Sequence, residues 1–265
     1  MMISVESICA DLTAVREKSP LVQNITNFVV MNNTANALLA IGASPVMAHA
    51  VEEVEDMVNI ASALVINMGT LNSQWVDGMI KAGKAATKKG IPVIFDPVGV
   101  GATPYRNEVA AQILEQCKPT VIRGNASEIM ALAKENVVTK GVDSSASSNS
   151  AVEAAKRLAT ETGAVVVISG PEDFITDGEL VLSTLNGSTM MARVTGMGCT
   201  ATAVLGAFAA INANAIQAAS HAMAVMGIAG ELATAKSTGP GTLQLNFLDQ
   251  LYTLSEADIK QTFKS

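Results

Sequence analysis

Short apolar runs alternate with longer stretches of helical periodicity along most of the chain. Runs such as "ALVINM" and "AVVVISG" are almost continuously hydrophobic, which is typical of parallel strands covered on both faces. Strands are predicted at 20–26, 44–48, 63–68, 91–97, 119–124, 164–170, 173–178 and 179–185. Amphipathic helices are predicted between them, most clearly at 73–90, 106–118 and 148–163. This βαβ rhythm favours an α/β fold with a doubly wound, mostly parallel central sheet flanked by helices.

The pattern changes near the last two predicted strands. Asp177-Gly178 separates them, and this dipeptide favours a tight antiparallel hairpin. From Gly198 to the C-terminus the pattern is almost entirely helical. No Pro/Ser-rich linker divides the chain, and the Ser-rich segment 141–150 is short enough to be a surface loop with a helix cap. We therefore expect one domain over residues 1–265, with a largely helical C-terminal part.

One long segment, 194–230, contains no Asp, Glu, Lys or Arg. Asn212, Asn214 and Gln217 interrupt it, so it has no run of about 20 apolar residues suited to a bilayer. Two helices buried inside a soluble protein explain the segment better. A membrane partner is therefore not expected.

Composition and charge narrow the class of partner. Hydrophobic residues make up 49% of the chain and charged residues 15%, so apolar material for a core is ample. The formal net charge of −7 disfavours nucleic acid as the main partner, and any phosphate site must be local. The 3 cysteines are widely spaced and the chain has 2 histidines, which supports neither a disulfide framework nor a zinc site. A reducing, cytoplasmic location is expected, since the N-terminal segment does not resemble a signal peptide.

One motif is misleading. Residues 78–85, "GMIKAGKA", nearly spell the phosphate-binding P-loop G-x-x-x-x-G-K-[ST]. The match lies inside a helical pattern instead of after a strand, and Ala85 stands where a hydroxyl would bind magnesium. We interpret Lys81, Lys84 and Lys88 as a solvated helix face.

Polar side chains end three predicted strands, at the edge where open parallel sheets bind their ligands. Asp96 suits a magnesium ion or a water, with a turn or cap role as the alternative. Arg123 brings a cation beside Glu128, as a nucleotide phosphate and its hydrated magnesium would require. Asn125 and Glu128 also have the spacing of a capping box, which leaves a purely structural role open. Ser169 adds a small hydroxyl at the end of a further strand.

Two segments indicate where a substrate binds. In "VTGMGCT" (194–200), Gly196 and Gly198 let the amides around Cys199 point into one hollow at the start of an apolar helix. Such a hollow stabilises a transferring phosphoryl group or an oxyanion, although close helix–sheet packing also explains the glycines. Residues 21–51 are uncharged and rich in asparagine, which suits a neutral small molecule or a subunit interface as well as helix caps.

Four motifs, in this order along the chain, carry a specific resemblance: "VQNITNFVVMNNTANALLAIGASPVM", "FDPVGVGAT", "VIRGNASEI" and "VTGMGCTATAV". Over nearly its whole length the chain resembles the hydroxyethylthiazole kinase family, which are ribokinase-like enzymes of thiamine biosynthesis and salvage. The resemblance implies a ribokinase-like fold and transfer of the ATP γ-phosphate to the hydroxyethyl group of 4-methyl-5-(2-hydroxyethyl)thiazole. It also implies Mg²⁺ as a cofactor and a homotrimer with substrate sites between subunits.

The resemblance also implies roles for single residues. Met47 and Gly196 are expected to contact the thiazole alcohol, and Arg123 and Ser169 to contact ATP. These assignments agree with the strand-end and glycine-turn positions of three of the four, whereas Met47 rests on the resemblance alone.

The catalytic and metal-binding roles fall on three further residues. The resemblance implies that Asp96 and Glu128 organise magnesium and its waters. Many ribokinase-like enzymes carry an acid after the glycines, "G-x-G-D", as a base on the acceptor hydroxyl, and Cys199 stands at that position here. A helix N-terminus lowers a thiol pKa, so we expect a partial thiolate. Phosphoryl transfer through a loose transition state asks little of a base, so Cys199 can serve without a covalent intermediate.

Three alternative functions are carried forward. A hydroxymethylpyrimidine kinase would share the fold but differ in the N-terminal substrate segment. A thiol-nucleophile transferase or hydrolase using Cys199 would need His49 or His221 as its partner. A non-catalytic thiazole-binding protein would bind the alcohol without ATP.

Overall fold

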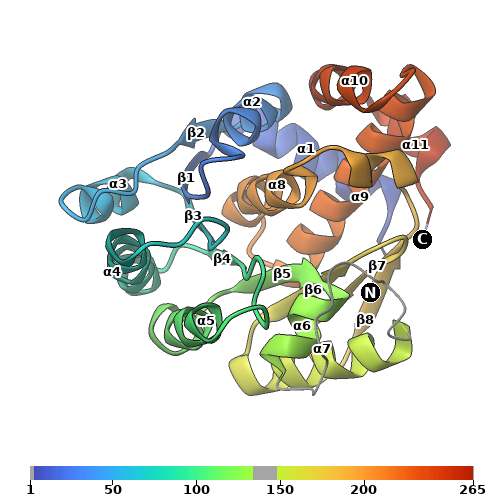
Figure 1. Cartoon of the computed structure of the whole chain (residues 1–265). Coiled ribbons are helices and arrows are strands. Elements are labelled where there is room, and N and C mark those ends of the chain that lie inside the picture. The colour runs from blue at the N-terminus through green and yellow to red at the C-terminus, as the bar shows by residue number, and fades with distance from the viewer. Residues whose placement is uncertain (1–2, 134–147, 265) are drawn as a thin grey trace.

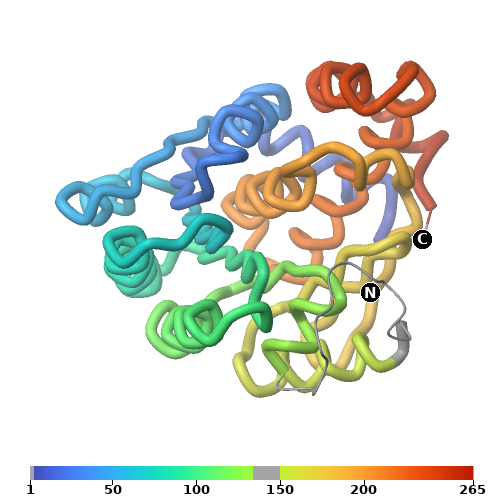
Figure 2. The backbone as a smooth tube through the Cα atoms, in the orientation of Figure 1, coloured from blue at the N-terminus to red at the C-terminus, as the bar shows by residue number. Residues whose placement is uncertain are grey.

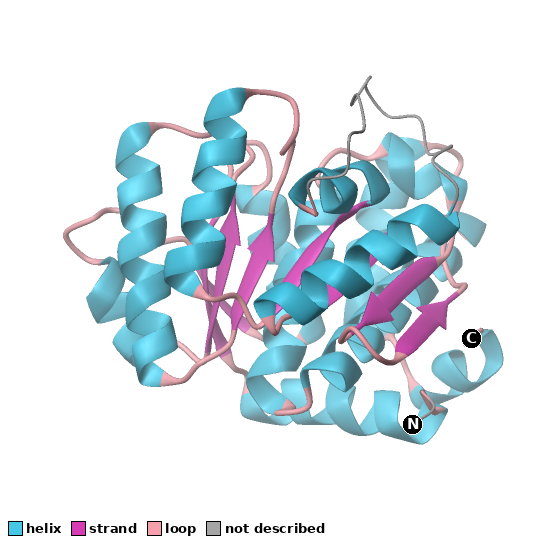
Figure 3. Cartoon of the chain, turned by 90° about the horizontal axis from the view of Figure 1, so that it is seen from below, coloured by secondary structure: helices cyan, strands magenta, loops and turns pink. Residues whose placement is uncertain are grey.

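The computed structural model describes residues 3–133 and 148–264. Within these ranges the chain forms an eight-stranded sheet between two layers of helices (Figures 1 and 3). The strand order is β2-β1-β3-β4-β5-β6-β7-β8, with parallel pairing from β2 to β6 and antiparallel pairing of β7 and β8. The strands are β1 (Leu21–Ile25), β2 (Ser44–Val46), β3 (Ala63–Asn67), β4 (Val93–Asp96), β5 (Val121–Asn125), β6 (Val165–Ser169), β7 (Asp173–Thr176) and β8 (Val181–Thr184).

Helices cover both faces of this sheet (Figure 1). One side carries α1 (Val5–Lys18), α2 (Met31–Ile41), α8 (Met197–Ile211), α9 (Ala215–Ala235), α10 (Pro240–Thr253) and α11 (Glu256–Thr262). The other side carries α3 (Val54–Ile60), α4 (Ser73–Lys89), α5 (Pro104–Cys117), α6 (Ala126–Leu132) and α7 (Ser148–Thr162). A short 3-10 helix, η1 (Thr189–Arg193), precedes α8.

Strand β3 shows why the middle runs are continuously apolar. Ala63 and Val65 belong to the core under α8 and α9, whereas Leu64 and Ile66 belong to the core under α4 and α5. Successive side chains of a strand point to opposite faces, so a strand covered on both sides buries every residue. The doubly wound, mostly parallel sheet predicted from the sequence is therefore confirmed.

Most predicted elements are found at their predicted positions. Seven predicted strands contain an observed one, β5 extends one residue beyond its predicted end to Asn125, and α4, α5 and α7 lie within three residues of the predicted helices. The P-loop-like residues 78–85 lie inside α4, so the motif is indeed misleading. Lys84 and Lys88 are exposed, as expected. Lys81 is only half-exposed, because its Nζ donates to the Val51 carbonyl at 2.9 Å and pairs with Glu55 at 3.0 Å.

The uncharged segment after residue 194 forms the centre of one helical layer. Phe208 of α8 and Ala224 of α9 have 0% exposed surface, and both helices pack against the N-terminal α1 (Figure 2). Among residues 3–133 and 148–264, no helix is both long and apolar enough to cross a membrane. Most of the Ser-rich segment 141–150 lies outside the described residues.

The close approach of α8 to the sheet positions the candidate site. A Cβ added to Gly206 would lie 2.9 Å from Val65 Cγ2, so glycine is required for this approach. The first turns of α8 consequently reach the carboxyl edge of the sheet, where Thr202 contacts Asp96 at the end of β4.

Candidate active site

Asp96 is the last residue of β4 and is almost fully buried. Its Oδ2 accepts hydrogen bonds from Asn67 Nδ2 and Thr202 Oγ1, both at 2.8 Å. Burial raises the pKa of Asp96 to about 6, and the Glu128 carboxylate adds to this rise, whereas the Arg123 guanidinium opposes it. Asp96 therefore lies among charged side chains from β5 and α6, with one carboxylate oxygen fixed by two donors.

Glu128 does form the capping box that the sequence left open. Asn125 Oδ1 accepts from the Glu128 amide and Glu128 Oε2 accepts from the Asn125 amide, each at 2.9 Å. Its other oxygen, Oε1, accepts from the Gly99 amide at 2.9 Å. The structural role is thus present, and the charge of Glu128 still acts on Asp96.

Arg123 and Ser169 meet on neighbouring strands. Arg123 in β5 donates from one Nη atom to Ser169 Oγ, and Ser169 is the last residue of β6. A Cβ on Gly198 would lie 2.7 Å from an Arg123 Nη atom, so this glycine lets the first turn of α8 approach the guanidinium. The sequence predicted these two residues to share a phosphate site, and the structure does bring them together.

Asp173, at the start of β7, was not predicted. It is buried, and its Oδ1 accepts from the Gly170 amide at 3.0 Å, so it holds the turn that follows Ser169. Burial raises the pKa of Asp173 to about 6, against the effects of the Gly170 amide and the Arg123 guanidinium. The bond to Gly170 spans three residues, so the position of Asp173 just after Ser169 was a signal in the sequence, and the antiparallel pairing of β6 and β7 keeps it at the β6 end.

Cys199 lies in the first turn of α8 and is only partly exposed. Asn27 Nδ2 donates to its Sγ at 3.4 Å and also to Asn67 Oδ1 at 2.9 Å. Burial, followed by the nearby Asp96 carboxylate, raises the pKa of the Cys199 thiol to about 11. The predicted lowering of this pKa is wrong, because burial and a neighbouring anion outweigh the helix N-terminus.

A chain of polar side chains therefore joins the predicted residues. It runs from Cys199 through Asn27 and Asn67 to Asp96 and Thr202. Sequence reasoning missed Asn67 and Thr202. A signal for each exists, since Asn67 ends the apolar strand β3 and Thr202 follows Cys199 in the same first turns of α8.

The two residues expected to contact the alcohol lie at the same edge of the sheet. Gly196 is the N-cap of α8 with φ of 82°, and a Cβ there would lie 2.6 Å from Val30 Cγ1, so glycine is required. Met47 directly follows β2, the strand that pairs with β1, and is half-buried.

Neither histidine partners the thiol. His221 in α9 is buried, with Nδ1 2.6 Å from Asp11 Oδ2 and Nε2 3.0 Å from Ser7 Oγ, and this triplet ties α9 to α1. The ring of His49 packs against Trp75, with centroids 4.5 Å apart. The arrangement gives no support to a thiol nucleophile that depends on a histidine base.

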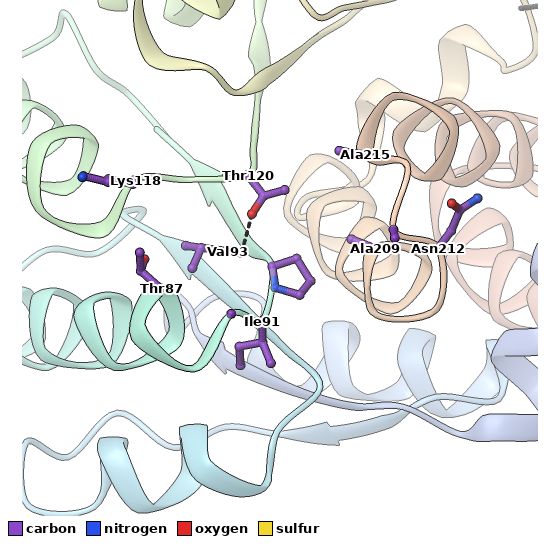
Figure 4. Close-up of a pocket in the computed structure, with 11 residues that line it drawn as sticks. Thr87, Ile91, Val93, Lys118, Thr120, Ala209, Asn212 and Ala215 are labelled. Atoms are coloured by element: carbon purple, nitrogen blue, oxygen red, sulfur yellow. Dashed lines mark hydrogen bonds between the residues drawn. The ribbon is translucent and has the colours of Figure 1, made fainter.

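A pocket at the opposite, amino edge of the sheet lacks this chemistry (Figure 4). It lies between α4, the start of β4 and the α8–α9 turn. Its Thr87 hydroxyl donates to the Cys117 carbonyl, Thr120 Oγ1 accepts from the Val93 amide, and Asn212 donates to Asp11. The Lys118 side chain extends away from the other lining residues (Figure 4). The carboxyl edge, where charged groups converge, is therefore the candidate active site.

Comparisons with known proteins agree with this geometry. The profile of the hydroxyethylthiazole kinase family matches residues 12–257. A hydroxyethylthiazole kinase of Syntrophus aciditrophicus is 56% identical over 265 residues, which is 100% of this chain and 98% of the relative. One from Leptospira biflexa is 57% identical over 95% of this chain and 94% of its own length.

Solved structures extend the comparison to the fold. The hydroxyethylthiazole kinase structure from Pyrococcus horikoshii OT3 superposes with a TM-score of 0.91 at 42% identity, covering 98% of both chains. A pyridoxal kinase from Staphylococcus aureus superposes with a TM-score of 0.61 at 17% identity, over 80% of this chain and 88% of that one, which shows a shared ribokinase-like fold alone. On the family profile and these full-length relatives, the chain belongs to the hydroxyethylthiazole kinase family.

Proposed function

We propose that this chain transfers the γ-phosphate of ATP to the hydroxyethyl group of 4-methyl-5-(2-hydroxyethyl)thiazole, which yields the thiazole phosphate used for thiamine phosphate synthesis. Family membership supports the reaction. The observation that carries it is the convergence of Asp96, Arg123 and the first turn of α8 on one edge of the sheet. An anion binds well at such a place, because a guanidinium and the helix N-terminus both attract it.

The proposed binding roles follow the positions of the side chains. Arg123 and Ser169, joined by a hydrogen bond, bind the phosphates of ATP. Gly196 and Met47 flank the acceptor alcohol, and Met47 belongs to the uncharged segment 21–51, which suits a neutral ring. The glycine turn brings the α8 amides toward the transferring phosphoryl group.

We propose that Asp96 and Glu128 organise Mg²⁺. Magnesium keeps several waters and binds through one or two carboxylates plus substrate phosphates, which two neighbouring carboxylates fit. Asp96 suits a direct ligand because its Oδ2 is held by two donors, whereas both Glu128 oxygens already accept backbone amides. Among the described residues no cluster of three His, Cys, Asp or Glu side chains could hold a metal by itself, so phosphate oxygens and water must complete the shell. Bound magnesium would neutralise charge on the phosphates.

Cys199 is the proposed catalytic residue. With a pKa of about 11 its thiol is neutral near pH 7, so it hydrogen-bonds and orients the acceptor hydroxyl instead of acting as a standing thiolate. A loose transition state tolerates this arrangement, since positioning and charge stabilisation dominate phosphoryl transfer.

We further propose a cytoplasmic homotrimer with sites between subunits. Phe28, Val29 and Leu39, all in the uncharged segment 21–51, are 63%, 63% and 58% exposed, and large apolar side chains favour cover by another chain. Free cysteines suit a reducing compartment. Light scattering of the purified protein tests the assembly, and a monomeric mass would refute it.

A Mg²⁺-dependent ADP-release assay tests the reaction. The thiazole alcohol, the pyrimidine alcohol and ribose are compared in parallel, and the highest kcat/KM is expected for the thiazole alcohol. A higher value for the pyrimidine alcohol would assign the chain to the related pyrimidine kinase activity. Binding of the thiazole alcohol without any ADP release would indicate a non-catalytic binding protein.

A further inference from the structure

Arg106, in the first turn of α5, joins two loops at the carboxyl edge of the sheet. One Nη atom donates to the carbonyls of Met68 and Val98, both at 2.6 Å, and the other donates to the Gly69 carbonyl at 2.7 Å. Met68 and Gly69 follow β3, whereas Val98 follows β4. The planar guanidinium has fixed donor directions, so three such bonds hold both loops in one relative position.

These bonds also set the direction of two amide groups. A trans peptide is planar, with its carbonyl and its N–H on opposite sides, and the described residues contain no cis peptide. Since the Met68 carbonyl faces Arg106, the N–H of Gly69 points the other way, where it donates to Asn67 Oδ1 at 3.0 Å. In the same way, the N–H of Gly99 points away from Arg106 and donates to Glu128 Oε1 at 2.9 Å.

The two acceptors are side chains of the candidate active site. Asn67 donates to Asp96, and its Oδ1 also accepts a hydrogen bond from Asn27 Nδ2. The same Asn27 amide donates to Cys199 Sγ. Glu128 carries the charge that acts on Asp96. The Gly69 backbone lies directly against Asn27, since a Cβ on Gly69 would lie 2.5 Å from Asn27 Nδ2. A displacement of this backbone would therefore push directly on the residue that contacts the thiol.

We infer that Arg106 is a positioning residue for phosphoryl transfer, which acts by aiming the Gly69 and Gly99 amides at Asn67 and Glu128. The inference rests on the proposed kinase activity. Arg106 itself makes its bonds to backbone carbonyls, so its effect on the reaction passes through the two loops.

Arg16 offers a matched control elsewhere in the fold. It is also half-buried and donates to three backbone carbonyls, those of Leu251, Tyr252 and Leu254, at 2.9–3.2 Å. These bonds tie α1 to the C-terminal end of α10, apart from the residues of the candidate site. Arg16→Ala thus removes the same kind and number of interactions without touching the two active-site loops.

The test compares Arg106→Ala, Arg106→Lys and Arg16→Ala with the parent. For Arg106→Ala, kcat at saturating ATP and thiazole alcohol is expected to fall by about 10- to 100-fold, because small misplacements of reacting groups have effects of this size. The KM values should change less than kcat. Hydrogen–deuterium exchange should accelerate at the Gly69 and Gly99 amides. Arg106→Lys, whose ammonium lacks the planar fork, should recover part of both effects.

Arg16→Ala should lower Tm while leaving kcat and the exchange of those two amides unchanged. If Arg106→Ala behaves like Arg16→Ala, with a lower Tm but parental kcat and parental amide exchange, the positioning role is overturned. Should Arg106→Ala not fold, Arg106→Lys decides the same question by the same two readouts. If the parent does not phosphorylate the alcohol, the proposed function fails, and amide exchange alone still decides whether Arg106 aims the two amides.

Discussion

Asn67 Nδ2 donates to Asp96 Oδ2 at 2.8 Å, and each of the two residues has only 1% of its surface exposed. The two side chains end adjacent parallel strands at matched register, with Asn67 opposite Asp96. Asp96, which the sequence singled out, is therefore oriented in part by a neighbouring amide that sequence reasoning missed, together with the Thr202 hydroxyl.

We expect Asn67→Ala to lower both stability and turnover. The substitution removes the buried donor that Asp96 uses and the buried acceptor that Asn27 uses. Each buried polar group left unsatisfied costs about 1–3 kcal/mol of stability. Urea unfolding and kcat at saturating substrates measure the two effects. Asn59→Ala serves as control, since Asn59 is exposed on α3, outside the segment 21–51. A kcat equal to that of the parent would show that Asn67 is not needed to orient Asp96.

The raised pKa of Asp96 predicts a pH-dependent stability. A carboxyl pKa of about 6 in the folded state, against 3.8 ordinarily, means that the folded state binds the proton more tightly. The free energy of unfolding therefore falls as pH rises from about 4 to about 6, by up to about 3 kcal/mol from this group. Asp96→Asn removes this pH-dependent loss of unfolding free energy, because the asparagine amide stays neutral at every pH. Without Mg²⁺, the stability of the variant relative to the parent should increase between pH 4 and pH 7.5.

Asp173 provides the internal comparison for this experiment. Its pKa is also raised to about 6 by burial, so part of the parent's pH dependence belongs to it. Asp173→Asn should remove a similar share of the pH dependence of stability. Among the parent, the two single variants and the Asp96→Asn/Asp173→Asn double variant, the double variant should have the stability that depends least on pH. Equal pH dependence in the parent and both single variants would contradict the assignment of buried, proton-binding carboxyls.

Cys199 variants separate an orienting thiol from a nucleophile. Cys199→Ser should retain measurable turnover, because the α8 amides and the Asn27 donor remain. The kcat of Cys199→Asp should match or exceed that of the parent near pH 7. A carboxylate can accept the proton of the acceptor hydroxyl there, whereas a thiol whose pKa is about 11 is still protonated. The measurement is kcat at saturating ATP, because the added charge is also expected to raise the KM for ATP. Loss of all turnover in both folded variants, with a trapped covalent enzyme in the parent, would favour a nucleophilic thiol.

Arg123→Ala should weaken the binding of ATP far more than the binding of the thiazole alcohol. A charge-assisted contact to phosphate contributes roughly 1.5–3 kcal/mol, so ATP affinity should drop by about tenfold or more. Calorimetry on the parent and the variant measures this directly. Lys84→Ala, which removes an exposed cation from α4, controls for the change in net charge. Unchanged ATP binding in Arg123→Ala would remove this residue from the site.

Local pattern was sufficient for the fold and for much of the site. The continuous apolar runs predicted the strands, because a sheet covered on both faces buries successive side chains, as residues 63–66 of β3 show. Asp96, Arg123 and Ser169 could be predicted because parallel strands bring their carboxyl ends to one edge. The capping box of Asn125 and Glu128 was visible as well, since its contacts span three residues.

Tertiary structure decided the protonation and the orientation of those side chains. The pKa of Cys199 depends on burial and on Asp96, which lies about a hundred positions earlier in the chain, so the helix N-terminus alone predicted the wrong direction. The links from Asn67 to Asp96 and from Arg106 to two loops join segments whose proximity follows only from the strand order β1-β3-β4 and the packing of α5. Hydrogen bonds and desolvation act over a few ångströms of space, whatever the separation along the sequence. Several residues of the candidate site were therefore predicted from the sequence, whereas Asn67 and Thr202 were missed, and the protonation and orientation of the side chains were set by neighbours that the fold supplies.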